Sequence, residues 1–501
     1  MAAAELHPAT LAAFLGYLAL VSAIGVWAAR RSAKGLGEFF LAGRKLGRLV
    51  VGLSAVVSGR SAWLLIGFTG LAWAVGSSAI WAAAGYVVIE ALLFVTVGPR
   101  LRRFSEQYGC LTLPDFFAAR FGEPRAIATV LRVELVVVLL GFLVGYVGAQ
   151  IRAGGKSFAS GFGLEDWLGV ALTAGVILAY TMLGGFLAVS LTDVLQAVLM
   201  IVALVVLPAV AIADLGGWSR FLSELSALEP AMVDPTSVGA LTIVGWLAIG
   251  LGSPGSPHIL VRYMAIDDPR SLRTAAIVAT AWNGTMAGGA LLVGLVGRVY
   301  FPLESSLPGG DRESLFPALA SIELSPFLYG VVLAAILAAI MSTADSQLLV
   351  CASSVVRDLY EKLWRRGRPL PGPALVTWSR VVIVALVGIA VLLGLSSDEL
   401  VVWFVLFAWA GLGAALGPAM LFSLYWRRTT AAGILAGMAC GALTVILWKE
   451  VFSLGGLLYE LLPGFAAGVA ATVAVSLASR PPADADAMFE TMRGGRSTRD
   501  G

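Results

Sequence analysis

The chain of 501 residues is 59% hydrophobic and only 13% charged, and its mean hydropathy is +0.89. Soluble domains carry about a quarter charged residues, so the composition excludes a soluble enzyme or a nucleic-acid-binding domain and indicates a protein of the lipid bilayer. The net charge of +3 says little by itself, because the placement of the charges carries more information.

Apolar runs long enough to cross a bilayer follow one another along nearly the whole chain. A membrane span needs about 20 apolar residues. Such runs are too long for barrel strands, and a helix satisfies every backbone amide within its own segment. We therefore predict an all-α fold, a polytopic membrane protein of about 13 transmembrane helices. The runs lie at residues 9–29, 48–76, 78–99, 127–151, 165–185, 192–214, 237–256, 272–298, 327–352, 377–395, 400–425, 430–448 and 462–479.

The charges of the connecting loops alternate in sign along the chain. Counted in chain order, loops one, three, nine and eleven are rich in Lys and Arg, whereas loops six and eight are acidic. Because Lys and Arg gather in cytoplasmic loops, we predict that the odd loops and the C-terminus are cytoplasmic and that the N-terminus is outside. The membrane would be the bacterial inner (plasma) membrane. The basic residues are Arg30, Arg31, Lys34, Arg44, Lys45, Arg48, Arg100, Arg102, Arg103, Arg120, Arg125, Arg357, Lys362, Arg365, Arg366, Arg368, Arg427 and Arg428.

Two of the predicted spans are interrupted. The second contains the sequence SGRS at 58–61, and the seventh ends in GLGSPGSP at 250–257, where Gly and Pro lower helix propensity. Interrupted spans in corresponding halves are typical of secondary transporters, whose binding sites lie near the bilayer midplane. The five-span spacing predicts two inverted repeats, spans 2–6 (about 48–214) and 7–11 (about 237–425). The alternative is that these Gly and Pro residues only serve helix packing.

The domain organisation is simple. We predict a single transmembrane transporter domain over residues 1–480 and a disordered cytoplasmic tail over 481–501, which is polar and rich in Pro and Gly. The tail is too short for a catalytic or signalling domain. The sequence has no histidine cluster, nucleotide-binding glycine loop or nucleophile–base pair, so we predict that the protein is not an enzyme.

Six motifs follow one another in the chain: SGRSAWLLIGFTG (58–70), LTLPDFFAARFG (111–122), GGFLAVSLTDVLQAVLM (184–200), PHILVRYMA (257–265), ILAAIMSTADSQLLVCASS (336–354) and WAGLGAALGPAMLFSLYWRR (409–428). In this order and spacing they resemble the sodium:solute symporters, most of all the sodium/proline branch of that family. The resemblance extends from about residue 10 to about 480. It implies a fold of two inverted five-helix repeats with flanking spans, which agrees with the positions of the two interruptions.

The resemblance also implies a sodium site between the interruption in span 2 and the middle of span 9. Sodium is a hard cation that prefers oxygen ligands. The alternative is that the two hydroxyls of this set only bond to carbonyls one helical turn earlier. The implied ligands are the backbone carbonyls of Val57, Arg60 and Ala339 and the side-chain hydroxyls of Ser342 and Thr343.

Three carboxylates lie within predicted spans, where acidic residues are functional hypotheses by default. Asp193, in a TD-x-x-Q run, resembles a family residue linked to sodium coupling; the alternative is a carboxylate that caps a helix end near the interface. Asp345 in span 9 is a second candidate for coupling or charge pairing. Glu90 in span 3 has no counterpart in the resemblance, and we expect it to pair with a basic residue.

The resemblance places the solute close to the two interruptions. Tyr146 occupies a position that faces the substrate in the sodium/proline branch, whereas Ile249 and Ser253 stand where that branch has aromatic residues. Aromatic rings suit the apolar ring of proline, and free backbone amides suit a carboxylate. The alternative is that these aromatics only pack or form an interfacial belt. The implied substrate-binding residues are Arg60, Ser61, Trp63, Tyr146, Ser253 and Pro254.

The chain departs from the sodium/proline branch in span 2, where Gly59 replaces an aspartate and Arg60 replaces an apolar residue. An arginine near the bilayer centre costs about 2.5–3.5 kcal/mol on insertion scales, so it needs a partner, and Asp345 or Glu90 are the candidates. Three hypotheses follow. Sodium still binds and Arg60 holds a solute carboxylate; or the guanidinium replaces the cation and transport does not depend on sodium; or Asp345 replaces the lost aspartate and Arg60 tunes it.

These observations predict a secondary active transporter that takes up proline, or a similar small carboxylate-bearing solute, together with Na⁺ by alternating access. One alternative is a sodium-independent or proton-coupled transporter or exchanger of another amino or organic acid. An alternative of a different class is a membrane solute sensor. We expect a small-molecule substrate and the lipid bilayer as partners, with no nucleic acid and no obligatory protein partner.

Overall fold

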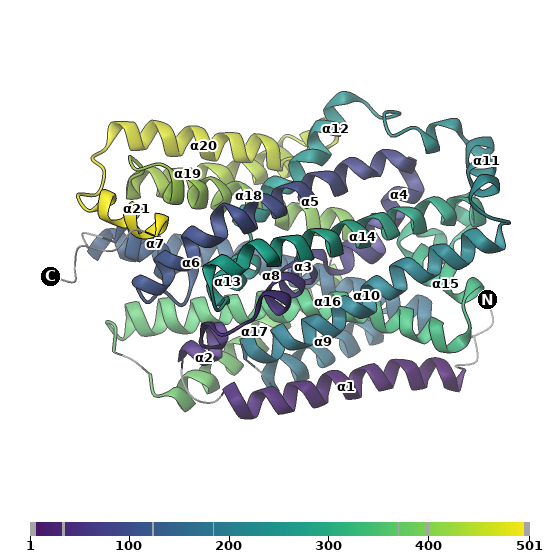
Figure 1. The fold of residues 1–501 in the computed structure, drawn as a ribbon, viewed down its shortest axis with the longest axis horizontal. Helices are drawn as coiled ribbons and strands as arrows, with labels where there is room; N and C mark the ends of the chain where they lie inside the picture. Colours follow the sequence, from purple (N-terminus) through teal and green to yellow (C-terminus); the bar gives the residue numbers. More distant parts are fainter. Residues whose placement is uncertain are drawn as a thin grey trace.

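The computed structural model describes residues 7–32, 36–122, 125–183, 185–368, 370–396 and 400–494. Within these ranges the chain is helical, and the β-pairing is limited to one isolated bridge between Leu46 and Ile266. The predicted all-α class is confirmed. The long helices lie roughly side by side in one bundle (Figure 1).

Each of the predicted runs overlaps a helix. Ten segments among the described residues are long and apolar enough to span a bilayer; one of these, Arg48–Val95, holds the second and third predicted spans, and Asp166–Met182 and Ala240–Gly255 are shorter. The number of crossings stays a prediction. The helices are α1 (Pro8–Ser32), α3 (Arg48–Ala62), η2 (Trp63–Phe68), α4 (Thr69–Val75), α5 (Ile80–Val95), α8 (Arg125–Phe162), α9 (Asp166–Leu183), α10 (Phe186–Asp214), α12 (Ala240–Leu247), η5 (Ala248–Gly255), α13 (Pro257–Ala265), α14 (Leu272–Tyr300), α16 (Pro326–Ser353), η10 (Ser354–Trp364), α17 (Gly372–Ser396), α18 (Val401–Tyr425), α19 (Ala431–Ile446) and α20 (Leu461–Ala478).

Short helices lie at the two ends of the bundle. At the left end in Figure 1 are α2 (Leu36–Leu41), α6 (Val97–Gln107), α7 (Leu113–Phe121) and α21 (Ala485–Arg493); at the right end are α11 (Trp218–Leu228) and α15 (Leu315–Glu323). The described part of the chain begins at the right end with α1 and finishes at the left end with α21, as an odd number of crossings requires. The basic residues of α6 and the acidic residues of α11 therefore lie at opposite ends, whereas the sides of the membrane stay a prediction.

The tail differs from the sequence-based expectation of disorder over 481–501. Helix α21 lies within it, and Met488, Phe489 and Met492 of that helix are buried. The Arg120 guanidinium lies 5.4 Å from the ring centroid of Phe489, and Arg103 donates to the carbonyl of Met492 across 3.2 Å. The prediction of disorder is wrong for 485–493, because the apolar residues of this polar segment fall on one helical face. Residues 495–501 lie outside the described residues.

Helices α3 and α16 lie in the centre of the bundle (Figure 1). Every residue of α3 from Val51 to Ala62 is buried, and α16 packs against α1, α3, α8 and α10. Buried polar groups must find partners within the protein, because an unsatisfied polar group in an apolar environment is costly. The serines, threonines and charged residues of these two helices therefore have to pair with one another, and their pairings form the candidate site.

Candidate functional site

The predicted interruption of span 2 is present at Ser61. This residue has φ +47° and ψ −173° inside α3, a left-handed conformation that is unfavourable for a residue other than glycine. Three contacts hold it: the Trp63 amide donates to Ser61 Oγ across 3.1 Å, Tyr146 donates to the same oxygen across 3.3 Å, and the Ala62 amide donates to Gln150 Oε1 across 2.9 Å. The non-helical φ and ψ of Ser61 change the direction of the helix here, and side chains accept the hydrogen bonds of backbone amides next to the kink.

The predicted interruption of span 7 is also present. Helix α12 ends at Leu247, a 3₁₀ segment (η5) follows, and Ser256 adopts an extended conformation before Pro257 begins α13. Segment η5 packs against α5 and α18. Its approach to α5 is close, since a Cβ on Gly250 would overlap the carbonyl of Gly85. Small residues at this contact bring the second interruption next to the third span.

Four of the five residues implied as sodium ligands lie together where α3 meets α16. Ser342 Oγ lies 3.2 Å from the Val57 carbonyl and 3.0 Å from the Ala339 carbonyl. The carbonyl of Arg60, by contrast, accepts a hydrogen bond from the Trp63 amide. In this conformation the hydroxyls donate to carbonyls, so a cation at this point would replace these hydrogen bonds.

Sequence reasoning missed Ser58 at the same point. Thr343 Oγ1 donates to the Ser58 carbonyl across 3.0 Å, and Ser58 Oγ donates to the Ser342 carbonyl across 3.2 Å. The position of Ser58 within the interruption was the signal that could have identified it. The oxygens that converge here are neutral, and neutral oxygens suit a cation that must be released again.

Asp193 forms a buried ion pair with Arg262 of α13. Its Oδ2 accepts from Arg262 Nη2 across 2.9 Å and from Ser54 Oγ across 2.5 Å, and both charged side chains are fully buried. Arg262 also donates to Ser346 Oγ across 2.6 Å and to the carbonyl of His258. The burial of Asp193 removes the alternative of a cap near the interface. Arg262 was overlooked, although it stands in the motif 257–265.

Asp345 lies on α16, two residues after Thr343, and it is fully buried. Neither of its carboxylate oxygens has a hydrogen-bond partner among the described residues. The Asp345 carboxyl group interacts electrostatically with the charges of Asp193 and Arg262. Asp345, one of the two candidate partners of Arg60, is therefore not its partner in this structure.

Arg60 pairs with Glu90 instead. Its Nη2 donates to Glu90 Oε1, and its guanidinium carbon lies 3.8 Å from the ring centroid of Tyr86. Glu90 also accepts from Ser253 Oγ across 3.2 Å and from Asn283 Nδ2 across 2.9 Å. The expectation that Glu90 pairs with a basic residue is confirmed, and the pair connects α3, α5, η5 and α14.

A small cavity of about 20 Å³ lies beside this pair, and it has room for about one water molecule. Arg60, Trp63 and Tyr146 line it, as the resemblance implied. Ser61 contacts Tyr146, whereas Ser253 directs its hydroxyl at Glu90 and, like Pro254, does not line the cavity. The complete lining is Gly59, Arg60, Trp63, Tyr86, Tyr146, Ile249, Val405, Leu406 and Trp409.

Trp409 is a lining residue that sequence reasoning missed. Its indole nitrogen donates to the Ile249 carbonyl across 2.8 Å, and its ring centroid lies 6.5 Å from that of His258. The residue opens the motif 409–428, but periodicity does not show which side of a buried helix faces a cavity. Helix α18 therefore contributes the aromatic ring of Trp409 to the lining of the cavity.

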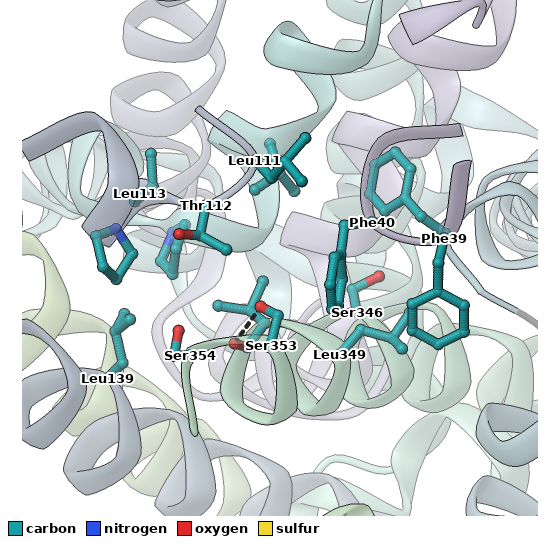
Figure 2. A pocket seen from close by; sticks show the side chains of 15 residues that line it. Phe39, Phe40, Leu111, Thr112, Leu113, Leu139, Ser346, Leu349, Ser353 and Ser354 are labelled. Atoms are coloured by element: carbon teal, nitrogen blue, oxygen red, sulfur yellow. Dashed lines mark hydrogen bonds between the residues drawn. The ribbon is translucent and has the colours of Figure 1, made fainter. Parts of the chain in front are cut away.

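Two further cavities lie at opposite ends of this region. A cavity of about 610 Å³, lined by the first residues of α12 and α18, shares Ile249 and Leu406 with the small cavity. At the other end, a cavity of about 30 Å³ reaches Ser346, whose hydroxyl accepts a hydrogen bond from Arg262 and donates one to the Ser342 carbonyl. Figure 2 shows this second cavity between Phe39 and Phe40 of α2 and the α16 face that carries Ser346. The site thus lies between two cavities of very different volume.

The model of the sodium:solute symporter family matches residues 39–441. The chain belongs to the sodium:solute symporter family. It is 40% identical to the sodium/proline symporter of Escherichia coli (strain K12) over 467 residues, which cover 91% of this chain and 90% of that protein. It is 37% identical to the osmoregulated proline transporter OpuE of Bacillus subtilis (strain 168) over 462 residues, which cover 92% and 93%.

A solved structure of a Na⁺-coupled sialic acid symporter, in a substrate-bound outward-open state, has the same fold. Its TM-score is 0.79 at 18% identity, and the match covers 95% of this chain and 99% of that one. A structure of Mhp1, a nucleobase-cation-symport-1 family transporter, matches with a TM-score of 0.56 at 13% identity and covers 90% and 98%. This sodium:solute symporter is accordingly a multi-pass membrane transporter of a family of carriers, and not an enzyme.

Proposed function

We propose that this symporter takes up proline, or a similar small carboxylate-bearing solute, together with sodium by alternating access. The observation that carries this proposal is the convergence of the Ser342 and Thr343 hydroxyls on carbonyls at the interruption of α3. Neutral oxygens from two helices are the ligand set that a hard, exchangeable cation prefers. The names of the relatives, which are proline transporters and sodium/proline symporters, support proline as the first solute to test.

Sodium would act by holding α3 and α16 together. Its ligands would be the carbonyls of Val57 and Ala339 with the two hydroxyls, and the carbonyl of Arg60 if that group turns away from the Trp63 amide. A cation shared by two helices favours the arrangement in which their oxygens converge, so its binding and release shift the population between arrangements. The inequality of the two outer cavities supports a carrier that opens to one end at a time.

The contacts of Arg60 favour the first of the three hypotheses about it. Its guanidinium engages Glu90 and the Tyr86 ring, so it is held on the cavity side of the interruption and does not occupy the point where the hydroxyls of α16 meet α3. Its Nε is buried without a hydrogen-bond partner among the described residues. A solute carboxylate in the cavity would supply the missing acceptor.

Aromatic side chains surround the place where the solute ring would lie. Trp63, Tyr86, Tyr146 and Trp409 line the cavity. Flat rings with polar edges suit an apolar five-membered ring that carries a polar group. The cavity in this conformation is smaller than proline, so solute binding requires the walls to move apart, and the shared residue Ile249 is the point at which the cavity could join the larger one.

The charge distribution supports an orientation. We place the N-terminus outside and the C-terminus in the cytoplasm of a bacterial cell, with the protein in the plasma membrane, because basic loops gather on the cytoplasmic side. The cavity of about 610 Å³ would then open outward, since α12 follows the acidic sixth loop.

The decisive experiment is uptake of labelled proline into liposomes that contain the purified protein, with and without an inward sodium gradient. Uptake driven by sodium supports the proposal. Uptake that ignores sodium would favour the guanidinium of Arg60 as a replacement for the ion, or a proton-coupled carrier. No uptake under either condition would exclude proline, and binding of other small carboxylates, or a sensor role, would then be tested. Replacement of Ser379, a buried serine on α17 outside the site, by alanine provides a matched control.

A further inference from the structure

The cavity beside the interruption of α3 lies next to a balanced pair of charges. Arg60 lines it, and Glu90 contacts Arg60 directly from α5. Every other lining side chain among the described residues is aromatic, aliphatic or a glycine hydrogen. The side chains of Arg60 and Glu90 are only 2% and 5% exposed, so water screens their charges little. The positive charge in the cavity wall is therefore neutralised by a carboxylate directly behind it, and the net charge at the cavity is close to zero.

A cavity with this balance distinguishes solutes by their net charge. A singly charged acid that binds next to Arg60 adds an uncompensated negative charge to a buried site, because Glu90 already neutralises the arginine. Uncompensated buried charges are strongly unfavourable. A solute with one carboxylate and one primary or secondary ammonium group adds no net charge, and each of its groups finds an opposite charge within the pair.

Unpartnered donors mark the side on which a carboxylate would bind. Arg60 Nε, Trp63 Nε1 and the hydroxyl of Tyr86 are all buried without a hydrogen-bond partner among the described residues. All three residues line the same cavity. Buried donors without acceptors are costly, and a carboxylate has enough lone pairs for all three.

The negative side lies next to the backbone of α3. A Cβ built on Gly59 would lie 3.6 Å from Glu90 Oε1, so no side chain at this position separates the carboxylate from the interruption. The hydroxyl of Ser253 and the amide of Asn283 fix the same carboxylate from η5 and α14. Glu90 is thus held in place by two neutral donors in addition to Arg60.

We infer that Glu90 determines solute specificity: it neutralises Arg60, so that the cavity selects a zwitterion with one carboxylate and one primary or secondary ammonium group over a singly charged acid. This inference rests on the proposed function and narrows its solute class. Without Glu90, the guanidinium would make the cavity a site for anions. Glu90 acts here through Arg60 as a positioning residue, and the relevant readout is a ratio of affinities.

The test compares three probes of nearly equal shape by isothermal titration calorimetry at fixed pH and sodium concentration. They are L-proline, a zwitterion; (S)-tetrahydrofuran-2-carboxylate, in which oxygen replaces the ring nitrogen; and L-prolinol, which keeps the amine but lacks the carboxylate. We expect the wild type to bind proline at least about tenfold more tightly than either analogue, a difference of about 1.4 kcal/mol. Glu90→Gln should lower the preference for proline over the acid by at least about tenfold, and Arg60→Met should lower the preference for proline over prolinol.

Two further variants make the test independent of the folding of Glu90→Gln. The double variant Arg60→Met/Glu90→Gln removes both buried charges and should bind the three probes with nearly equal affinity. Glu224→Gln removes a carboxylate from the exposed helix α11 and should leave every ratio unchanged. Proline binding with an unchanged ratio in Glu90→Gln, or in the double variant, would overturn the inference and leave the proposed function intact. Tighter binding of the acid than of proline by the wild type would overturn the inference and favour an organic acid as solute, whereas binding of no probe by any variant would overturn both.

Discussion

Separating Asp193 from Arg262 tests whether this buried ion pair holds the centre of the bundle together. The pair joins α10 to α13, and Arg262 reaches α3 and α16 through Ser54 and Ser346. With Nη2 and Oδ2 2.9 Å apart and charge centres at about 4 Å, an effective dielectric constant of about 20 gives an attraction of about 4 kcal/mol. Breaking a buried pair typically costs about 3–5 kcal/mol. We therefore expect Asp193→Asn to destabilise the protein by about 3 kcal/mol.

The assay is a double-mutant cycle on the free energy of unfolding of the solubilised protein in mixed micelles. Arg262→Met should also cost about 3 kcal/mol, whereas the double variant should cost little more than either single one, because no charge is then left alone in the core. The coupling energy should therefore be about 3 kcal/mol. The exposed pair Arg220–Glu224, 2.8 Å apart on α11, is the matched control and should couple by less than about 1 kcal/mol. Additive single costs for the buried pair would refute the reasoning.

Three further predictions concern other parts of the molecule. Ser342→Ala should raise the sodium concentration for half-maximal uptake by about tenfold, the loss of about 1.4 kcal/mol of ligand interaction, while Ser379→Ala leaves it unchanged. Burial raises the pKa of Asp115, but Arg357 and a second arginine lower this pKa by a larger amount. The pKa of Asp115 therefore lies below its ordinary value. The ionised Asp115 carboxylate should stabilise the protein above about pH 4, and this stabilisation should be lost as the pH falls below that value. The melting temperatures of the wild type and of Asp115→Asn should therefore converge below about pH 4. Phe489→Ala should detach α21, since its apolar face is small, and speed trypsin cleavage near the C-terminus without a loss of uptake.

The sequence predicted the interruptions and the contact between spans 2 and 9, but not the partners of the buried charges. Clusters of Gly, Ser and Pro indicated both interruptions because their backbone effects are local, although single prolines such as Pro208 and Pro418 lie inside continuous helices. The partner of Arg60 depends on which helix faces it, and both Asp345 and Glu90 lay in spans of suitable depth. The contact of Arg60 with Glu90, and the packing of Gly250 on Gly85 that brings Ser253 of η5 to the same carboxylate, are long-range facts that periodicity does not contain.

The tail and the buried arginine of α13 escaped prediction for a different reason. Composition made residues 481–501 appear disordered, although three apolar side chains on one face are enough to dock α21 on a surface that already exists. Arg262 stood inside a recognised motif, yet its role became visible only when Asp193 and Ser346 were found beside it. Both cases involve a partner that lies far away in the sequence, and a single sequence offers no signal for such a contact.

The proposed ion site and the proposed solute cavity share one short piece of backbone, and this offers a physical route for coupling. Val57 and Ser58 present carbonyls to the hydroxyls of α16, while Arg60 and Trp63, a few residues later, line the cavity. Between them Ser61 adopts a strained conformation that side-chain contacts hold in place. A cation that draws the Val57 carbonyl toward α16 should therefore move the turn that carries Arg60, and a solute that engages Arg60 should act back on the same carbonyl. Because such a coupling is reciprocal, sodium should raise the affinity for solute by the same factor by which solute raises the affinity for sodium.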